Sequence, residues 1–297
     1  MASCITRFAP SPTGLLHVGH AFSAAQAWAR ADRPGGFRLR IEDIDRTRCR
    51  PEFITALLDD LAWLGLEPGA PPLRQSAGHH RHRAALERLR AQGLLYACTC
   101  TRAAQAAAAP HPGEGTAYPG TCRGRRDPPP AIPFAWRLDL AGTGLGLWQG
   151  WQDEQAGPRA GRADLGGDPV LWRKDDGPAY HLACVIDDAH QGVSLVVRGR
   201  DLEPWTALQR LLQRLLGLPE PRYLHHRLIL GPDGRRLAKR DRPVTLAALR
   251  ASGADGRALA RQLSELPATG PDLGWDGAAF APAPTVVPGG APAGQGA

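Results

Sequence analysis

Hydrophobic and polar positions along the first third of the chain follow two periods in turn. A short apolar run at 5–9 and another at 37–41 predict strands, because apolar residues are continuous there over a strand's length. Apolar residues spaced three and four apart predict helices at 19–31, 51–64 and 78–92. Strands that alternate with helices are typical of a parallel sheet. The pattern therefore predicts an α/β fold with a doubly wound parallel sheet, whose ligands bind at the carboxyl ends of the strands.

The pattern is interrupted in the middle of the chain. Residues 97–165 are rich in Gly, Pro and Ala and contain only short strand-like runs such as 134–140, so we expect an insertion with a small site of its own. The alternation of elements then resumes. Strands are predicted at 170–173, 194–198 and 224–230, and helices at 179–187 and 202–216.

Short helices are predicted at 244–251 and 257–264, and from Pro267 onward Pro, Gly and Ala dominate without periodicity, which predicts a disordered tail. No internal repeat is visible. The predicted organisation is therefore a first half of a catalytic domain, an insertion, a second half and a tail. These parts span residues 1–96, 97–165, 166–265 and 266–297.

Composition restricts the class of protein. No run approaches the roughly 18 apolar residues of a membrane span, and the N-terminus lacks a signal pattern, so we expect a cytoplasmic protein without a membrane partner. The net charge of +7 suits a polyanionic partner such as RNA, although a charge bias without any partner stays open. Only two of the 36 basic residues are lysines, Lys174 and Lys239. A retained lysine is informative where a compact ammonium must meet a phosphate.

The segment 7–20 contains the first candidate site. It reads Arg-Phe-Ala-Pro-Ser-Pro-Thr-Gly-Leu-Leu-His-Val-Gly-His and lies between a predicted strand and a predicted helix. A helix N-terminus offers free N–H groups and the positive end of a dipole, so phosphate binds there readily. His17 and His20 add donors, and Gly19 leaves room for a flat base against the backbone. The segment predicts a nucleotide site.

This segment resembles the entry motif of class I glutamyl-type aminoacyl-tRNA synthetases over some fourteen positions. The stretch 231–240, Gly-Pro-Asp-Gly-Arg-Arg-Leu-Ala-Lys-Arg, resembles the mobile lysine loop of the same enzymes. It departs from their pattern, because Arg236 stands at the first lysine and Ala238 at the serine, whereas Lys239 stands at the second lysine. The alternative for this loop is a basic surface hairpin. The resemblance covers roughly residues 4–250.

The resemblance implies a class I synthetase fold and activation of L-glutamate by ATP with Mg²⁺. His17, His20 and Lys239 would be catalytic, and ATP would contact His17, Gly19, His20, Arg236 and Lys239. The implied glutamate contacts are Arg7, Ala9, Ser11, Glu42, Tyr180 and Arg198. An arginine fork suits a carboxylate because it can donate two parallel hydrogen bonds.

Two further carboxylates follow Glu42 in the same segment. Asp43 and Asp45 either contact the substrate or form ion pairs with nearby arginines, and the residues alone leave both interpretations open.

The insertion contains three cysteines at close spacing. Cys98, Cys100 and Cys122 can supply three ligands of a tetrahedral zinc site, and His111 is the first guess for the fourth from ligand chemistry. Cys-x-Cys followed by Tyr-x-x-x-Cys resembles the zinc element of glutamyl-queuosine tRNA(Asp) synthetases. This resemblance implies that Tyr118 takes the fourth position and that one structural Zn²⁺ is bound per chain.

After position 240 only 57 residues remain, whereas glutamyl-tRNA synthetases continue into a large anticodon-binding domain. Together with the resemblance of the zinc element, this implies an enzyme that transfers glutamate to queuosine at the wobble position of tRNA(Asp), and we expect it to be a monomer. One alternative is a truncated glutamyl-tRNA synthetase that charges the 3′ end of tRNA(Glu). An alternative of another class is a non-catalytic paralogue that binds RNA.

Overall fold

A parallel sheet forms the centre of the molecule. The computed structural model describes residues 3–32, 35–101, 118–231, 234–235, 237 and 244–283. Within them β2 (Phe37–Ile41) pairs in parallel with β1 (Thr6–Phe8) on one side and β3 (Leu73–Arg74) on the other. A second set of paired strands runs in the order β9 (Leu195–Gly199), β10 (Arg222–His226) and β6 (Trp148–Asp153), also in parallel.

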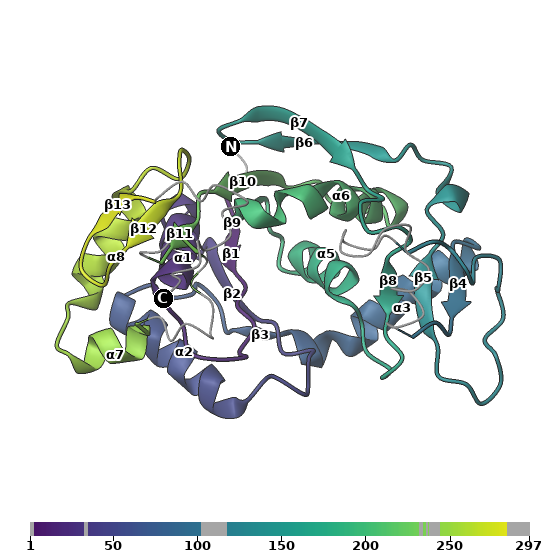
Figure 1. Ribbon diagram of the computed structural model, residues 1–297, viewed down its shortest axis with the longest axis horizontal. Helices are drawn as coiled ribbons and strands as arrows, with labels where there is room; N and C mark the ends of the chain where they lie inside the picture. Colours follow the sequence, from purple (N-terminus) through teal and green to yellow (C-terminus); the bar gives the residue numbers. More distant parts are fainter. Residues whose placement is uncertain are drawn as a thin grey trace, which may run out of the picture.

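The two sets of strands meet between β1 and β9. The backbone N–H groups of Ser194 and Leu195 both donate to the carbonyl oxygen of Ile5, at 2.9 and 3.1 Å. The strand order across the molecule is therefore β3-β2-β1-β9-β10-β6, with the antiparallel β7 (Gly157–Arg162) beyond β6 (Figure 1).

Both faces of this sheet are covered, as a doubly wound fold requires. On β9, Leu195 and Val197 belong to the apolar core around α1, whereas Val196 between them belongs to the core around α5 and α6. Alternate side chains of a strand point to opposite faces, so helices must lie on both sides. Figure 1 shows α1 and α8 on one flank and α5 with α6 on the other. The α/β parallel-sheet prediction is confirmed.

Most of the predicted helices form within a few residues of their expected bounds. The α-helices are α1 (Val18–Arg30), α2 (Pro51–Leu64), α3 (His79–Ala91), α5 (Tyr180–His190), α6 (Thr206–Leu215), α7 (Leu246–Ala251) and α8 (Gly256–Glu265). Short 3-10 helices occur at η1 (Gln75–Gly78), η2 (Ala141–Thr143) and η3 (Arg200–Trp205). In the described part of the chain, no helix has the length and apolar character needed to cross a membrane.

The predicted insertion, residues 97–165, contributes strands to two different sheets. A small antiparallel sheet joins β4 (Leu95–Cys98), which crosses the start of the insertion, β5 (Ala135–Leu138) within it and β8 (Val170–Trp172) beyond its end. The ribbon β6–β7 lies inside the predicted range but continues the central sheet. Composition could not separate the two, because both stretches are rich in glycine and proline.

The strand predicted at 224–230 is broken. β10 ends at His226, and β11 (Ile229–Leu230) pairs instead with β12 (Leu273–Trp275). The break is held by Asp272, whose carboxylate accepts the backbone N–H of Leu228 at 2.7 Å.

The prediction of a disordered tail from 266 is wrong for its first part. β12 and β13 (Phe280–Pro282) form an antiparallel pair, and Trp275 is buried in the core beside α1. Leu273, Trp275 and Phe280 pack in or against the core around α1 and so hold this segment in place. Three apolar residues in a Pro/Gly-rich stretch are too few for the sequence to show a hydrophobic period. Residues 284–297 lie outside the described part of the chain.

Candidate active site

A cleft of about 330 Å³ opens at the carboxyl ends of the central strands. Its walls come from the residues after β1 and β2, the last residues of β9 and β10, and the first turns of α1 and α5. The lining residues used below are Arg7, Ala9, His17, Gly19, His20, Glu42, Tyr180, Arg198, Asp201, His226 and Leu237. This is where a doubly wound sheet is expected to bind its ligand.

Two histidines cap the helix that faces the cleft. His17 is the N-cap of α1: its Nδ1 accepts the N–H of Gly19 at 3.2 Å, and Nδ1 of His20 accepts the N–H of His17 at 3.2 Å. Because both Nδ1 atoms accept, the neutral rings carry hydrogen on Nε2 and can donate from there. The ring centroids lie 3.8 Å apart. The first turn of α1 thus combines the positive end of a helix dipole with two imidazole donors.

Gly19 lines the cleft and also leaves room for the His17 ring. A Cβ at this position would lie 3.1 Å from the His17 ring and 3.6 Å from the carbonyl oxygen of Ile229. The missing side chain therefore lets the His17 ring fold back over the helix start.

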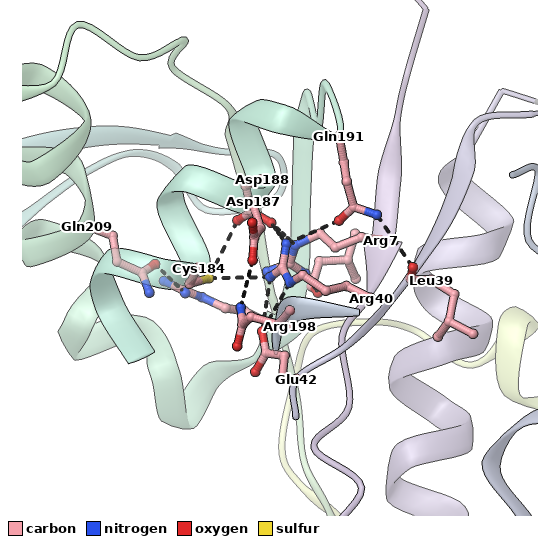
Figure 2. Close-up of polar contacts among 12 residues, drawn as sticks. Arg7, Leu39, Arg40, Glu42, Cys184, Asp187, Asp188, Gln191, Arg198 and Gln209 are labelled. Atoms are coloured by element: carbon pink, nitrogen blue, oxygen red, sulfur yellow. Dashed lines mark hydrogen bonds and ion pairs between the residues drawn. The ribbon is translucent and has the colours of Figure 1, made fainter. Parts of the chain in front are cut away.

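A buried network of ion pairs forms one side of the cleft (Figure 2). Asp188 Oδ1 accepts from Arg7 Nε at 3.0 Å and from Arg40 Nη1 at 2.5 Å, and Arg7 also donates to the carbonyl oxygen of Val197 at 2.9 Å. Burial by itself raises the pKa of Asp188, but Arg40 and Arg7 hold it at about 2. Asp188 is therefore ionised and carries the negative charge that the two arginines share.

Glu42 joins the same network from the end of β2. Its Oε1 accepts from Arg40 Nη2 at 3.1 Å, and its side chain is 8% exposed at the cleft. Burial raises the pKa of Glu42 and is opposed by the charge of Arg40. Burial also raises the pKa of the neighbouring Cys184 thiol to about 12, so that thiol is neutral.

Arg198 enters the cleft from β9 without a carboxylate beside it. Nη1 donates to Gln209 Oε1 at 2.6 Å, Nη2 to Thr206 Oγ1 at 2.7 Å and Nε to His225 Nε2 at 3.3 Å. All three acceptors are neutral, and within the described residues no carboxylate pairs with this guanidinium. Arg198 is only 4% exposed. A buried charge without a counter-ion is costly, so the position favours an anionic ligand.

The charged side chains in and beside the cleft are three arginines, Arg7, Arg40 and Arg198, and three carboxylates, those of Glu42, Asp188 and Asp201. Their formal charges balance, but they are not paired evenly. Arg7 and Arg40 each have a carboxylate partner, whereas none of the described carboxylates pairs with Arg198. A ligand carboxylate is therefore favoured next to Arg198.

Most of the residues expected to bind glutamate or ATP lie together here. Five of the six candidate glutamate contacts line the cleft, namely Arg7, Ala9, Glu42, Tyr180 and Arg198, as do His17, Gly19 and His20. Ser11 is exposed and is not among the lining residues. Arg236 and Lys239 lie outside the described residues, although Leu237 from the same loop lines the cleft.

Several residues of the site were not identified from the sequence. Arg40 and Asp188 hold the ion-pair network, and Asp201 and His226 line the cleft. The charged positions within apolar runs, such as Arg40 in β2, were the available signal, because charges are rarely fully buried without a partner.

The two other carboxylates of the Glu42 segment have partners outside the cleft lining. Asp45 pairs with Arg48 at 2.6 Å, and Asp43 accepts from the backbone N–H and hydroxyl of Ser76, both at 2.8 Å. Neither lines the cleft. The expected ion pair with an arginine forms for Asp45, whereas the described partner of Asp43 is Ser76.

The three cysteines of the predicted metal site come together. The sulfur atoms of Cys98, Cys100 and Cys122 all lie within 4.8 Å of one another, so this group could hold a metal ion. The Tyr118 hydroxyl joins them, at 3.5 Å from Cys98 Sγ and 3.8 Å from Cys100 Sγ. His111, the other candidate, lies outside the described residues.

These distances fit a small tetrahedral site. Bonds of about 2.3 Å to sulfur and about 2.0 Å to oxygen place the ligands of a tetrahedron about 3.5–3.8 Å apart. The Cys100–Cys122 sulfur separation is 3.6 Å, within that interval. The phenol oxygen also accepts the N–H of Cys122 at 2.9 Å, which fixes it beside the thiols.

Comparison with known proteins agrees with this geometry. Residues 3–106 and 152–269 match the family model described as tRNA synthetases class I (E and Q), catalytic domain. A glutamyl-Q tRNA(Asp) synthetase of Rhodobacter capsulatus is 49% identical, covering 84% of this chain and 96% of that protein. The protein of the same name from Symbiobacterium thermophilum is 45% identical, covering 88% of this chain and 85% of its own length.

Solved structures show the same fold. A glutamate-tRNA synthetase of Elizabethkingia anophelis superposes with a TM-score of 0.73 at 27% identity, covering 89% of this chain. A glutamate tRNA ligase of Elizabethkingia meningosepticum, in complex with its amino acid, superposes with a TM-score of 0.67 at 29% identity, covering 81%. This chain spans 62% and 52% of those two chains. The chain therefore belongs to the class I tRNA synthetases of the glutamyl and glutaminyl group, in the family whose curated members are named glutamyl-Q tRNA(Asp) synthetase.

Proposed function

We propose that this protein activates L-glutamate with ATP and transfers it to queuosine in tRNA(Asp). The observation that carries the amino acid is the buried Arg198, which has no carboxylate partner among the described residues. Glutamate carries a second carboxylate in its side chain, which can pair with this guanidinium. The tRNA substrate is supported by the names of the curated relatives.

The first step is adenylate formation. A carboxylate oxygen of glutamate attacks the α-phosphorus of ATP, the P–O bond to the β-phosphate breaks, and pyrophosphate leaves with the electron pair. The protein's contribution is to position the reactants and to stabilise charge on the phosphoryl oxygens. His17 and His20 would donate from Nε2 at the start of α1. Lys239 and Arg236 would bind the pyrophosphate side, and Mg²⁺ supplied with ATP would shield its charge.

The amino acid would bind between the buried ion-pair network of Arg7 and Glu42 on one side and Arg198 on the other. Arg7 and Arg198 can contact the carboxylates, and Glu42 retains an oxygen that Arg40 does not use, which suits the ammonium. Ala9, Ser11 and Tyr180 complete the proposed contacts. In the second step a hydroxyl of the queuosine cyclopentenediol attacks the adenylate carbonyl, and AMP leaves.

We further propose that Cys98, Cys100, Tyr118 and Cys122 hold one structural Zn²⁺. Their separations suit tetrahedral coordination, and four protein ligands leave no open position for water. Such an ion would tie β4 to the segment 118–122 and would take no part in the reaction.

Two assays test the activity. ATP–pyrophosphate exchange should depend on glutamate and should proceed without tRNA, a result that a non-catalytic RNA-binding paralogue would not give. Labelled glutamate should then attach to tRNA(Asp) that contains queuosine and not to matched tRNA(Asp) without it. Attachment at the 3′ adenosine of tRNA(Glu) instead would indicate a glutamyl-tRNA synthetase and contradict the proposal.

A further inference from the structure

We infer that Gln209 is a positioning residue that determines the choice of glutamate over glutamine, because it holds Arg198 through a neutral amide and so keeps the guanidinium charge available. This inference rests on the proposed function and concerns a residue that does not line the cleft. Gln209 lies on α6, is 2% exposed and reaches Arg198 from behind. Figure 2 shows its amide directed at the arginine.

The hydrogen bonds of Arg198 leave donors for a ligand. A guanidinium has five N–H groups, and three of them are used by Gln209, Thr206 and His225. One N–H remains on each of Nη1 and Nη2. Two such donors on neighbouring nitrogens are what a carboxylate requires from an arginine.

All three acceptors are held in a neutral state. His225 donates Nδ1–H to Asp153 at 2.9 Å, which leaves Nε2 with one lone pair, and both the Thr206 hydroxyl at 3.1 Å and Arg198 Nε at 3.3 Å face it. Burial and the positive charge of Arg198 lower the pKa of His225, so its ring stays uncharged. The carboxylate of Asp153 is thus kept one residue away from the guanidinium.

The same cleft contains the opposite arrangement for comparison. Arg7 has its charge paired by Asp188 at 3.0 Å, and Arg40 shares that carboxylate. If Gln209 were a glutamate, its carboxylate would stand 2.6 Å from Arg198 and pair it in the same way. The substituted carboxylate would remove one unit of positive charge from the surroundings of the substrate side chain, which suits the neutral amide of glutamine better than the carboxylate of glutamate.

The test is the isosteric variant Gln209→Glu, assayed by ATP–pyrophosphate exchange. We expect the KM for glutamate to rise about 10- to 100-fold, as for the loss of a buried charge pair, while the KM for ATP stays within about twofold. The ratio of kcat/KM for glutamate over glutamine should fall at least about tenfold. Failure of the wild-type protein to activate glutamate would refute the proposed function itself, which separates the two outcomes.

A matched control lies one helical turn further along α6. Gln213 is 3% exposed and accepts a hydrogen bond from Arg210, so Gln213→Glu introduces the same carboxylate beside another arginine. This variant should keep the wild-type KM for glutamate. A neutral variant, Gln209→Met, should lower kcat/KM and retain the preference for glutamate over glutamine.

Two results would overturn the inference. An unchanged glutamate KM in a folded Gln209→Glu protein would show that the charge of Arg198 is not reserved for the substrate. An equal rise in the KM values for glutamate and ATP, or an equal loss in Gln213→Glu, would show only a structural effect. Folding is checked by the thermal unfolding midpoint of each variant.

Discussion

At the scale of single residues, the roles of identical side chains are set by their neighbours. Arg7 and Arg198 are both about 4% exposed and line one cleft, yet one is paired with a carboxylate and the other is bound only by neutral acceptors. In a low-dielectric site the difference between a paired and an unpaired guanidinium decides which ligand charge is favoured. The motifs locate both arginines, but they do not reveal these partners.

Tyr118 permits a test at the same scale. Because its hydroxyl lies 3.5 Å from Cys98 Sγ, we expect Tyr118→Phe to remove one zinc ligand and to weaken zinc retention about 10- to 100-fold. The measurement is transfer of the metal from the full-length protein to a colorimetric chelator, with one zinc per chain expected in the wild type. The unfolding midpoint of the metal-loaded variant should fall as well.

The variant His111→Ala provides the control, because His111 is the other candidate for the fourth position. Zinc retention at the wild-type level in Tyr118→Phe, together with loss in His111→Ala, would reassign the ligand. If both variants retain zinc at the wild-type level, the three cysteine thiolates are sufficient to hold the ion.

At the scale of elements, contacts between segments distant in sequence override local composition. The segment after 267 reads as disordered, but Trp275 is 5% exposed in the core beside α1, and β12 pairs with β11. Likewise, the strand predicted at 224–230 breaks because Asp272 and Ala268 accept backbone N–H groups at 227 and 228. Hydrogen bonds to a remote segment can compensate for a lost strand pairing.

The contact between α2 and α7 gives a pH-dependent prediction. Asp60 on α2 is fully buried and pairs with Arg250 on α7 at 3.0 Å, and burial raises its pKa from 3.8 to about 6. Below pH 3.8 Asp60 is protonated in both the folded and the unfolded protein, so its raised pKa does not reduce the free energy of unfolding. The reduction grows as the pH rises and is complete above pH 6.

The variant Asp60→Asn removes this titration. We therefore expect the unfolding free energy of the wild type, relative to Asp60→Asn, to fall by up to about 3 kcal/mol between pH 4 and pH 7. Urea unfolding at several pH values measures it. Glu52→Gln, an exposed change on the same helix, should show no comparable trend. A difference that stayed constant with pH would refute the raised pKa of Asp60.

At the scale of the whole molecule, the charge balance predicts how RNA binding responds to salt. The chain carries a net charge of +7, and 34 of its 36 basic residues are arginines. Contacts to phosphate release counter-ions, so we expect tRNA(Asp) affinity to fall at least about tenfold between 50 and 200 mM KCl. Filter binding measures the affinity.

Glutamate binding should respond differently. The cleft charges are buried and screened little, so the KM for glutamate in ATP–pyrophosphate exchange should change less than about twofold over the same salt range. Equal salt dependence of both quantities would contradict the buried site, and salt-independent tRNA binding would contradict a binding mode dominated by phosphate contacts.

The sequence by itself predicted the fold class, the helix start that His17 and His20 cap, and many of the residues that line the cleft. These features depend on the hydrophobic period within single segments and on the order of the motifs along the chain. The helices α1, α2 and α5 accordingly formed close to their predicted bounds. Only the tertiary structure decided which arginines of the cleft are paired with a carboxylate and which are not. Asp188 reaches Arg40 across 148 positions of the chain, and the three neutral partners of Arg198 come from α6 and β10. Pairing of buried charges depends on which elements pack together, and no period along a single segment contains that information.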